Sequence, residues 1–303
     1  MTSGLAAALM AGGCPSQLVS AADPAGRCHP DTWSGPSAWP VTAPSPNWSL
    51  TFTGPTGDVP VIGEPSPKII SVINGAKLRG VITDWGGVLT TPILTTVQAW
   101  IEADGIDWDS YYTVMRAWIF NAYDPSGGGS PVHALERGEC SGAEFERLLA
   151  AELLLTDGGP VAAEGLLQRM FAASAQVPAM YEMLRAVRGA GFRTALLSNS
   201  WGGYEYPWAD FSGLFDTVVI SGECGMRKPE EAIFLHTAKG LRLDPEQCVF
   251  IDDLEANVAA AAGCGMTAVH HTEAAQTVAV LQDLLGIPLG SGPGSTIPGN
   301  TMR

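Results

Sequence analysis

The amino-acid sequence predicts an α/β protein built on a doubly wound parallel sheet, with a helical block inserted after the first strand. From about residue 77 onward, apolar runs of strand length alternate with segments of helical periodicity. The connections between them are short, which is typical of a parallel sheet covered by helices on both faces. A long helical stretch interrupts this alternation directly after the first strand, so we expect it to lie outside the sheet layer.

The first strand is predicted over LRGVIT (78–83), whose branched apolar residues suit a buried position. In the block that follows, SGAE (141–144) has the spacing of a capping box, with Ser141 as N-cap and Glu144 folding back. We expect residues 92–177 to form a helical cap above the carboxyl edge of the sheet. Its helices are predicted at 93–120, 133–157 and 161–174.

The remaining elements complete the sheet and its helical cover. A helix is predicted at 178–190, ahead of the second strand. Strands are predicted over RTALLS (193–198), TVVI (217–220), CVFID (248–252) and TAVH (267–270). Helices are predicted at 229–241, 254–263 and 273–285. Residues 77–91 and 178–287 together are therefore expected to form the α/β core.

Both ends of the chain differ in composition from this core. Residues 1–76 hold 11 of the 22 prolines, together with many Ser, Gly and Thr, and show no sustained apolar period. Such a segment buries too little apolar surface to offset its conformational entropy, so we expect an extension that is mostly disordered. Residues 288–303, rich in Gly, Pro and Ser, are expected to form a flexible tail.

The charge of the chain limits its partners. The 31 acidic and 16 basic residues give a formal net charge of −15, with a pI near 4.6. Nucleic acid and anionic membranes are polyanionic, so we expect neither as a partner. No apolar run approaches the about 18 residues of a membrane-spanning helix. The six cysteines are scattered without metal-binding spacing, which favours free thiols and a cytoplasmic location. The oligomeric state is not readable from the sequence.

Polar residues stand where four predicted strands end. They are Asp84, Ser198 with Asn199, Lys228 in the loop after TVVI, and Asp252 with Asp253. In an open parallel sheet the carboxyl ends of the strands meet at one edge, and ligands bind there. A carboxylate nucleophile, a hydroxyl, a lysine and paired acids at one edge are the parts of a phosphoryl-transfer site.

Four motifs in this order resemble a known family. VITDWGGVLT, ALLSNS, GMRKPEEAIF and VFIDDLEANVAAAAGCGM, spread over residues 78–286, are similar to the haloacid dehalogenase-like hydrolase superfamily. The likeness is greatest to the phosphatase-like group that includes the amino-terminal half of soluble epoxide hydrolase. The resemblance implies a Rossmann-like core under a helical cap and hydrolysis of a small phosphorylated metabolite.

The resemblance also implies roles for single residues. Asp84 matches the nucleophile that forms an aspartyl-phosphate, and Lys228 matches the lysine that offsets negative charge on nucleophile and phosphate. Ser198 matches the hydroxyl that binds a phosphate oxygen, with Asn199 beside it. Gly87 belongs to the Gly-Gly turn that lets the backbone fold tightly beside the transferred group.

A magnesium ion is part of the same expectation. The resemblance places Mg²⁺ on the carboxylates of Asp84 and Asp253 and on the backbone carbonyl of Gly86. Asp252 is expected to act through water or by orienting Lys228. Asn257 matches a supporting position on the following helix, while Arg116, Arg137 and Arg147 in the cap are candidates for contacting the substrate.

Gly86 departs from the family pattern. Most phosphatases of the family carry Asp-x-Asp, in which the second acid protonates the leaving oxygen, whereas the string here is Asp84-Trp85-Gly86. Such proton transfer contributes about 10²–10⁴-fold to a rate. We therefore expect a phosphatase selective for leaving groups that depart without protonation, such as anomeric, acyl or aryl phosphates, or one that takes its proton from the cap. On this reasoning Gly86→Asp should accelerate hydrolysis of alkyl phosphates.

Two other functions are compatible with the sequence. A haloacid dehalogenase also lacks the second acid and uses the same aspartate at carbon without a metal, but Asp252 and Asp253 favour phosphate. A non-catalytic binding protein, using residues 1–76 as an interaction arm, is the third alternative.

Overall fold

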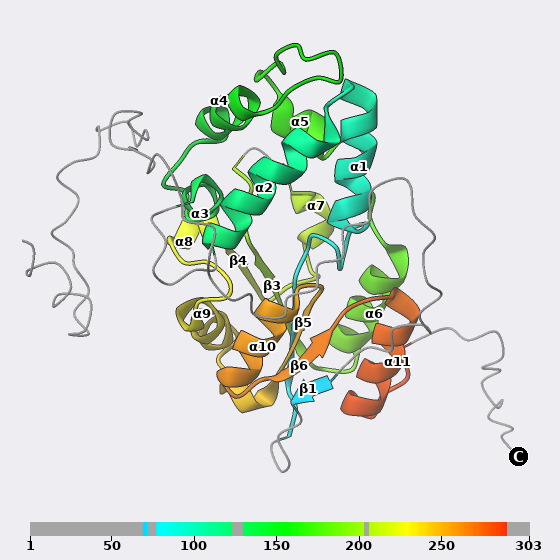
Figure 1. Ribbon diagram of the computed structural model, residues 1–303. Coiled ribbons are helices and arrows are strands. Elements are labelled where there is room, and N and C mark those ends of the chain that lie inside the picture. The colour runs from blue at the N-terminus through cyan, green and yellow to red at the C-terminus, as the bar shows by residue number, and fades with distance from the viewer. Residues whose placement is uncertain (1–68, 72–76, 123–129, 203–205, 290–303) are drawn as a thin grey trace, which may run out of the picture.

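A six-stranded sheet organises the chain in the computed structural model, which describes residues 69–71, 77–122, 130–202 and 206–289 (Figure 1). The strand order is β1-β6-β5-β2-β3-β4. The strands are β1 (Ile69–Ser71), β2 (Gly80–Thr83), β3 (Arg193–Ser198), β4 (Thr217–Ile220), β5 (Cys248–Asp252) and β6 (Thr267–His270). Every neighbouring pair among β2 to β6 is parallel, which confirms the predicted fold class.

The register of the sheet brings three strand ends together. Thr83 at the end of β2 is paired with Leu196 of β3 on one side and with Ile251 of β5 on the other. Asp84 therefore leaves the sheet between the ends of β3 and β5. The central position of β2 puts the residue after it at the middle of the carboxyl edge.

Strand β1 is an addition to the predicted sheet. It pairs antiparallel with β6, so Ile69–Ser71 covers the outer side of that strand. These residues fall within 1–76, which the sequence analysis treats as an extension, and that expectation is wrong for this short strand. Its β-branched residues explain the pairing. The rest of the predicted extension, residues 1–68 and 72–76, lies outside the described residues.

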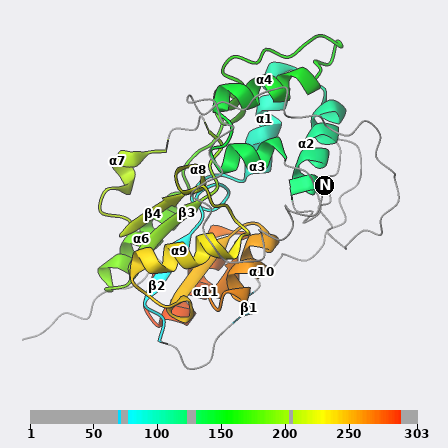
Figure 2. The same cartoon turned by 90° about the vertical axis from the view of Figure 1, so that its left-hand side faces the viewer.

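Helices cover both faces of the sheet, as predicted. On one face, α6 (Pro178–Gly189) and α11 (Ala274–Leu285) pack on apolar side chains of the strands such as Val81. On the other, α9 (Glu231–Leu241) and α10 (Glu255–Gly263) pack on side chains such as Ile82 (Figures 1 and 2). Successive strand residues point to opposite faces, which is why both are buried. Short helical turns occur at α7 (Trp208–Phe211), α8 (Ser221–Cys224) and 245–247.

Five helices between β2 and β3 pack around a separate core beyond the carboxyl ends of the strands (Figures 1 and 2). They are α1 (Ile93–Asp104), α2 (Trp108–Ala122), α3 (Pro131–Glu136), α4 (Gly142–Glu152) and α5 (Leu166–Met170). We call residues 93–170 the helical unit. Buried side chains such as Trp100, Phe145 and Leu149 form its core.

These helices are shorter than the sequence predicts. The helix expected over 93–120 is two helices, because α1 ends at Gly105 in the left-handed conformation with φ 65°. A glycine in this conformation is a common way for a helix to end. The helix expected over 133–157 is likewise divided into α3 and α4, and that expected over 161–174 is reduced to α5.

The predicted capping box at the start of α4 is half present. Ser141 Oγ accepts a hydrogen bond of 3.2 Å from the Glu144 backbone N–H, so Ser141 is the N-cap. The Glu144 carboxylate pairs with Arg147 instead of folding back.

The C-terminal boundary lies slightly beyond the predicted one. Leu289 is 6% exposed and packs in the core cluster that contains α11, whereas the sequence places it in the tail.

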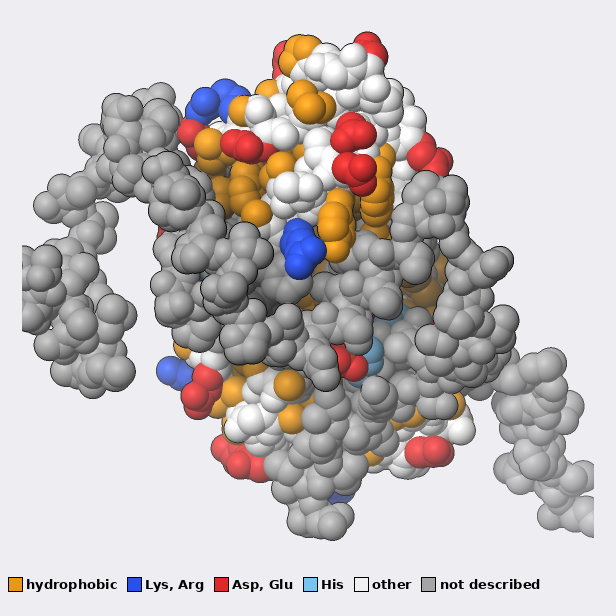
Figure 3. Space-filling view, in the orientation of Figure 1, with side chains coloured by type: hydrophobic (Ala, Val, Ile, Leu, Met, Phe, Trp, Pro, Cys, Tyr) orange, Lys and Arg blue, Asp and Glu red, His pale blue; other side chains and the backbone are white. Residues whose placement is uncertain are grey.

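On the face shown in Figure 3, acidic side chains are scattered over the upper and lower halves and basic side chains are few. Among the described residues, the helices are too short or too polar to cross a membrane.

Candidate active site

Asp84 is held at the centre of the carboxyl edge. Its backbone N–H donates to the Ile251 carbonyl at 2.9 Å, which continues the pairing of β2 with β5 past the last strand residue. The side chain is turned inward and the residue is 8% exposed. Its Oδ1 accepts a hydrogen bond of 2.7 Å from the Trp85 backbone N–H and lies 2.8 Å from Lys228 Nζ. Two donors thus fix one oxygen of the predicted nucleophile.

Lys228 bridges two carboxylates in the interior. Its side chain is 1% exposed, and Nζ lies 2.8 Å from Asp84 Oδ1 and 2.7 Å from Asp252 Oδ2. Burial alone would lower the pKa of this ammonium group. The charges and hydrogen bonds of Asp252 and Asp84 outweigh burial and raise the pKa of Lys228 above its ordinary value. Lys228 is therefore a permanent cation beside the predicted nucleophile.

The Asp252 carboxylate accepts hydrogen bonds from three residues of the protein. Besides Lys228, it accepts from Asn257 Nδ2 at 3.0 and 3.1 Å and from the Leu254 backbone N–H at 2.9 Å. The residue is 0% exposed. This geometry supports the expectation that Asp252 orients Lys228, and it gives Asn257 the supporting place on α10 that the resemblance implies.

Asp253 approaches the turn that follows Asp84. Gly87 in that turn has φ 74°, a region that favours glycine, and a Cβ there would lie 2.2 Å from Asp253 Oδ2. A side chain at position 87 would therefore displace the Asp253 carboxylate. Gly87, which is also expected to lie beside the substrate, leaves room for this carboxylate at the site.

Asp84, Asp252 and Asp253 fit a divalent cation. One carboxylate oxygen from each lies within 4.8 Å of the others. Burial raises the pKa of Asp84 to about 7; Lys228 opposes this rise and Asp252 adds to it. Burial and repulsion from Asp252 and Asp84 raise the pKa of Asp253 well above its ordinary value. One lysine does not balance three acids, and oxygen-rich sites of excess negative charge suit Mg²⁺.

The end of β3 places Ser198, and Asn199 directly after it, at the same edge. Ser198 is 3% exposed. The Asn199 side chain accepts from the Lys228 backbone N–H at 2.9 Å and donates to the Lys228 carbonyl at 3.1 Å. Asn199 therefore ties the loop after β3 to the loop that carries Lys228.

Tyr206 is a site residue that sequence reasoning missed. Its hydroxyl donates to Ser198 Oγ at 3.1 Å, and its ring lies 4.6 Å from the Trp85 ring between centroids. Burial raises the pKa of Tyr206 to about 12, so the phenol stays protonated and can donate. Tyr206 lies eight positions after Ser198 in the chain, and no periodic pattern links the two positions. The sequence therefore carries no sign of this contact.

A buried ion pair links the helical unit to the site, and this too was missed. Glu136 at the end of α3 pairs with Arg227, next to Lys228 in the chain. Both residues are under one tenth exposed. The Glu136 carboxylate of the helical unit therefore contacts the loop that carries Lys228.

Ion pairs within the protein engage Arg137 and Arg147, which were proposed to contact substrate. Arg137 pairs with Glu230, and Arg147 pairs with Glu144 on the exposed side of α4. Arg116 lies on α2 with an exposed side chain. The two ion pairs weaken the case for Arg137 and Arg147 as substrate ligands.

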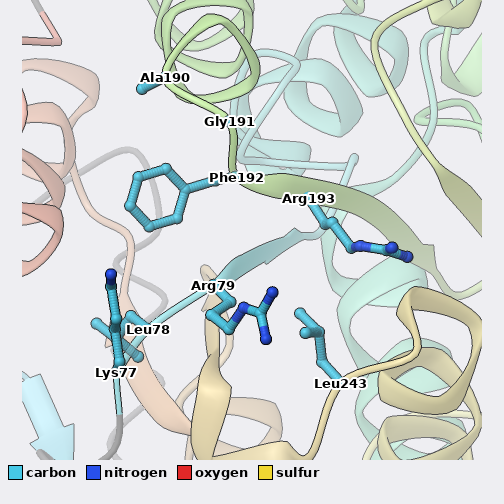
Figure 4. Close-up of a pocket in the computed structure, with 8 residues that line it drawn as sticks. All are labelled: Lys77, Leu78, Arg79, Ala190, Gly191, Phe192, Arg193 and Leu243. Atoms are coloured by element: carbon cyan, nitrogen blue, oxygen red, sulfur yellow. The ribbon is translucent and has the colours of Figure 1, made fainter.

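A pocket of about 280 Å³ lies at the opposite edge of the sheet (Figure 4). It adjoins the starts of β2 and β3, far along the strands from Asp84. Its lining residues are Lys77, Leu78, Arg79, Ala190, Gly191, Phe192, Arg193 and Leu243. This lining has neither a carboxylate nor a hydroxyl, so the carboxyl edge is the better candidate for chemistry.

A parallel α/β sheet carries an aspartate, a lysine and paired acids together at its carboxyl edge, an arrangement consistent with a hydrolase. Residues 78–265 match the family model described as haloacid dehalogenase-like hydrolase. The chain belongs to the haloacid dehalogenase-like hydrolase family, as the sequence motifs indicated.

Curated relatives share parts of the chain. Acyl-CoA dehydrogenase family member 10 of Mus musculus is 31% identical over 231 residues, which are 74% of this chain and 21% of that protein. Sesquiterpene phosphatase astK of Aspergillus oryzae is 30% identical over 116 residues, 35% of this chain and 56% of that protein. Bifunctional epoxide hydrolase 2 of Sus scrofa is 23% identical over 226 residues, 70% of this chain and 40% of that protein. The chain thus spans only part of the length of these relatives.

Two solved structures are similar to part of the chain. A predicted HAD-like family hydrolase from Porphyromonas gingivalis is 23% identical, with a TM-score of 0.47 over 69% of this chain and 98% of that one. A HAD phosphatase from Thermococcus onnurineus is 18% identical, with a TM-score of 0.47 over 70% of this chain and all of that one.

Proposed function

We propose that the protein is a Mg²⁺-dependent phosphatase that hydrolyses small phosphate monoesters through an aspartyl-phosphate on Asp84. The observation that carries the proposal is the position of Asp84 Oδ1, 2.8 Å from the buried Lys228 ammonium group, with the Asp253 carboxylate in the same cluster. A buried carboxylate nucleophile beside a fixed cation and further acids is the arrangement that phosphoryl transfer needs.

Each residue of the site has a part in this reaction. Lys228 and the Trp85 N–H hold Oδ1 of Asp84, so we assign the attack on phosphorus to Oδ2. The bond from Oδ2 to phosphorus forms as the bond to the leaving oxygen breaks, and water then hydrolyses the acyl phosphate. Ser198 and Lys228 bind phosphoryl oxygens, and Asn199 keeps their two loops together.

The metal site is formed by the acids of the cluster. We assign the carboxylates of Asp84 and Asp253 and the carbonyl of Gly86 as protein ligands, with Asp252 serving Lys228. A bound Mg²⁺ would neutralise charge on the phosphate as it is transferred. The helical unit, as part of a cap over residues 92–177, would close this edge to water.

The proposed substrates are small phosphorylated metabolites whose leaving groups need little protonation, because Gly86 supplies no acid. Among the relatives, a sesquiterpene phosphatase acts on a phosphorylated compound, as its name states, which is consistent with this class. The net charge of −15 argues against nucleic acid or an anionic membrane as a partner.

Hydrolysis of an aryl phosphate with and without Mg²⁺ tests the proposal. We expect turnover that needs the metal and falls at least about 10³-fold in Asp84→Asn, because amide nitrogen and oxygen do not replace the nucleophile. Asp283→Asn, an exposed aspartate on α11, is the matched control and should keep full activity.

Two results would replace the proposal. Halide release from a 2-haloacid without added metal would identify a dehalogenase. Binding of inorganic phosphate without turnover of any ester would identify a binding protein.

A further inference from the structure

The space beside Gly86 is filled by an isoleucine of the helical unit. A Cβ at position 86 would lie 3.1 Å from Cδ1 of Ile93 and 3.7 Å from its Cγ1. The first of these distances is tighter than nine in ten contacts that a real Cβ makes, so Ile93 would have to shift by a few tenths of an ångström. Ile93 therefore crowds the place where the side chain of a second acid would begin.

Ile93 is well held in this position. It is the first residue of α1, after Pro92, and packs against the core of the helical unit. The Thr91 N–H donates to the Ala175 carbonyl at 2.8 Å, and the Thr96 N–H to the Pro92 carbonyl at 3.2 Å. The β-branched side chain of isoleucine has few rotamers in a helix. A side chain at position 86 would therefore press against Ile93 at this end of α1.

Two large apolar side chains are exposed in segments that follow strands of the site. Leu94, the residue after Ile93 on α1, is 41% exposed, and Leu254, directly after Asp253, is 45% exposed. Both large apolar side chains follow strands whose ends form the candidate site, β2 and β5. Exposed apolar side chains at the same edge as a catalytic cluster give an apolar substrate group a surface to bury.

We propose that Ile93 lines the leaving-group side of the site and makes the enzyme selective for phosphate esters of apolar alcohols with low pKa, of which aryl phosphates are the representative class. This inference rests on the proposed function. When Asp84 attacks phosphorus, the bond to the leaving oxygen breaks with its electron pair. The oxygen departs as a phenolate, which takes its proton from water. The reaction therefore needs no proton donor at the place that Ile93 occupies.

The structure also changes the expectation for Gly86→Asp. The sequence predicts that this substitution alone accelerates alkyl phosphate hydrolysis, but Ile93 crowds the start of the new side chain. A gain should appear only when position 93 is made small as well. Gly86→Asp, Ile93→Ala and the double variant Gly86→Asp/Ile93→Ala therefore test the inference together.

Rates on a phenyl phosphate series and on a hexyl phosphate provide the first readout. We expect no gain on the alkyl ester from Gly86→Asp alone. The double variant should exceed Ile93→Ala on that ester by at least about 10-fold, part of the 10²–10⁴-fold that proton transfer contributes. Ile93→Ala alone should raise KM for phenyl phosphate several-fold and leave KM for a phosphate ester of glycerol nearly unchanged. A full gain from Gly86→Asp alone would overturn the inference.

Thermal unfolding provides a readout that does not depend on activity. Gly86→Asp should lower Tm clearly more in the presence of Ile93 than in the Ile93→Ala background. The control is Ile101→Ala, a buried isoleucine two turns later in α1, with which the effect of Gly86→Asp should be additive. Additive effects with Ile93→Ala as well would overturn the inference. Absence of turnover in the wild type and in every variant would refute the proposed function. The unfolding data would still show whether Ile93 contacts the side chain at position 86.

Discussion

Glu136 and Arg227 form an ion pair that is closed off from solvent and joins the helical unit to the sheet core. Arg227 is 3% exposed and Glu136 is 6% exposed. Burial raises the pKa of Glu136, and the Arg227 charge and hydrogen bond oppose the rise. Ser221 Oγ also donates to the Glu136 carbonyl. The end of α3 is thus fixed beside the loop that carries Lys228.

Removing one member of this pair should destabilise the protein strongly. Arg227→Met leaves a buried carboxylate without its cation, and we expect the free energy of unfolding to fall by about 3–5 kcal/mol in urea denaturation. The double variant Glu136→Leu/Arg227→Met should recover most of this loss. Arg147→Met, which breaks an exposed pair with Glu144, is the control and should cost under about 1 kcal/mol. Equal losses in the single and double variants would contradict the account.

Mg²⁺ should stabilise the protein through Asp253. At a metal concentration about 100 times Kd, binding adds about 2.7 kcal/mol to the free energy of unfolding, which a thermal melt detects as a higher Tm. Asp253→Asn should abolish this response. Because it also removes repulsion among three buried acids, the same variant should melt higher than the wild type in EDTA. A metal response that survives in Asp253→Asn would place the ion elsewhere.

Tyr206 should act through Ser198. Tyr206→Phe keeps the ring against Trp85 and removes the hydroxyl that donates to Ser198 Oγ. We expect kcat/KM for an aryl phosphate to fall about 3- to 10-fold, the range of one hydrogen bond. In a Ser198→Ala background the same substitution should have almost no effect. A full loss in that background would show that Tyr206 serves the site in some other way.

His133 should make stability depend on pH. Burial, together with the nearby charges of Arg227 and Arg137, lowers the pKa of His133 to about 4. The unfolded chain therefore binds the proton at higher pH than the native state does. The contribution is complete above about pH 6.5 and is lost as pH falls toward 4.

Urea unfolding of His133→Asn from pH 7.5 to 4.5 tests this effect. The wild type should lose on the order of 1–2 kcal/mol more than the variant over this range, after allowance for the half-buried position of the ring. Parallel curves for the two proteins would mean that His133 is protonated alike in the native and unfolded states.

The regular parts of the molecule could be predicted because their causes lie close together in the chain. Apolar runs of strand length and short connections identify the five parallel strands, whereas their order in the sheet was not predicted. Asp84, Ser198 and Asp253 could be found because each lies at the end of a strand or directly after it. The helix break at Gly105 was missed, and the second long helix was predicted without its break before Ser141, although Ser141 was predicted as an N-cap.

The sequence alone determined the fold class, the family and the acids and lysine of the site, because alternation along the chain and residues at strand ends are local properties. Tertiary structure decided which side chains surround those groups. Tyr206 on Ser198, Glu136 on Arg227 and Ile93 beside Gly86 are pairs from separate segments. Such contacts depend on how loops and helices pack in space, and no period or spacing in the sequence encodes them.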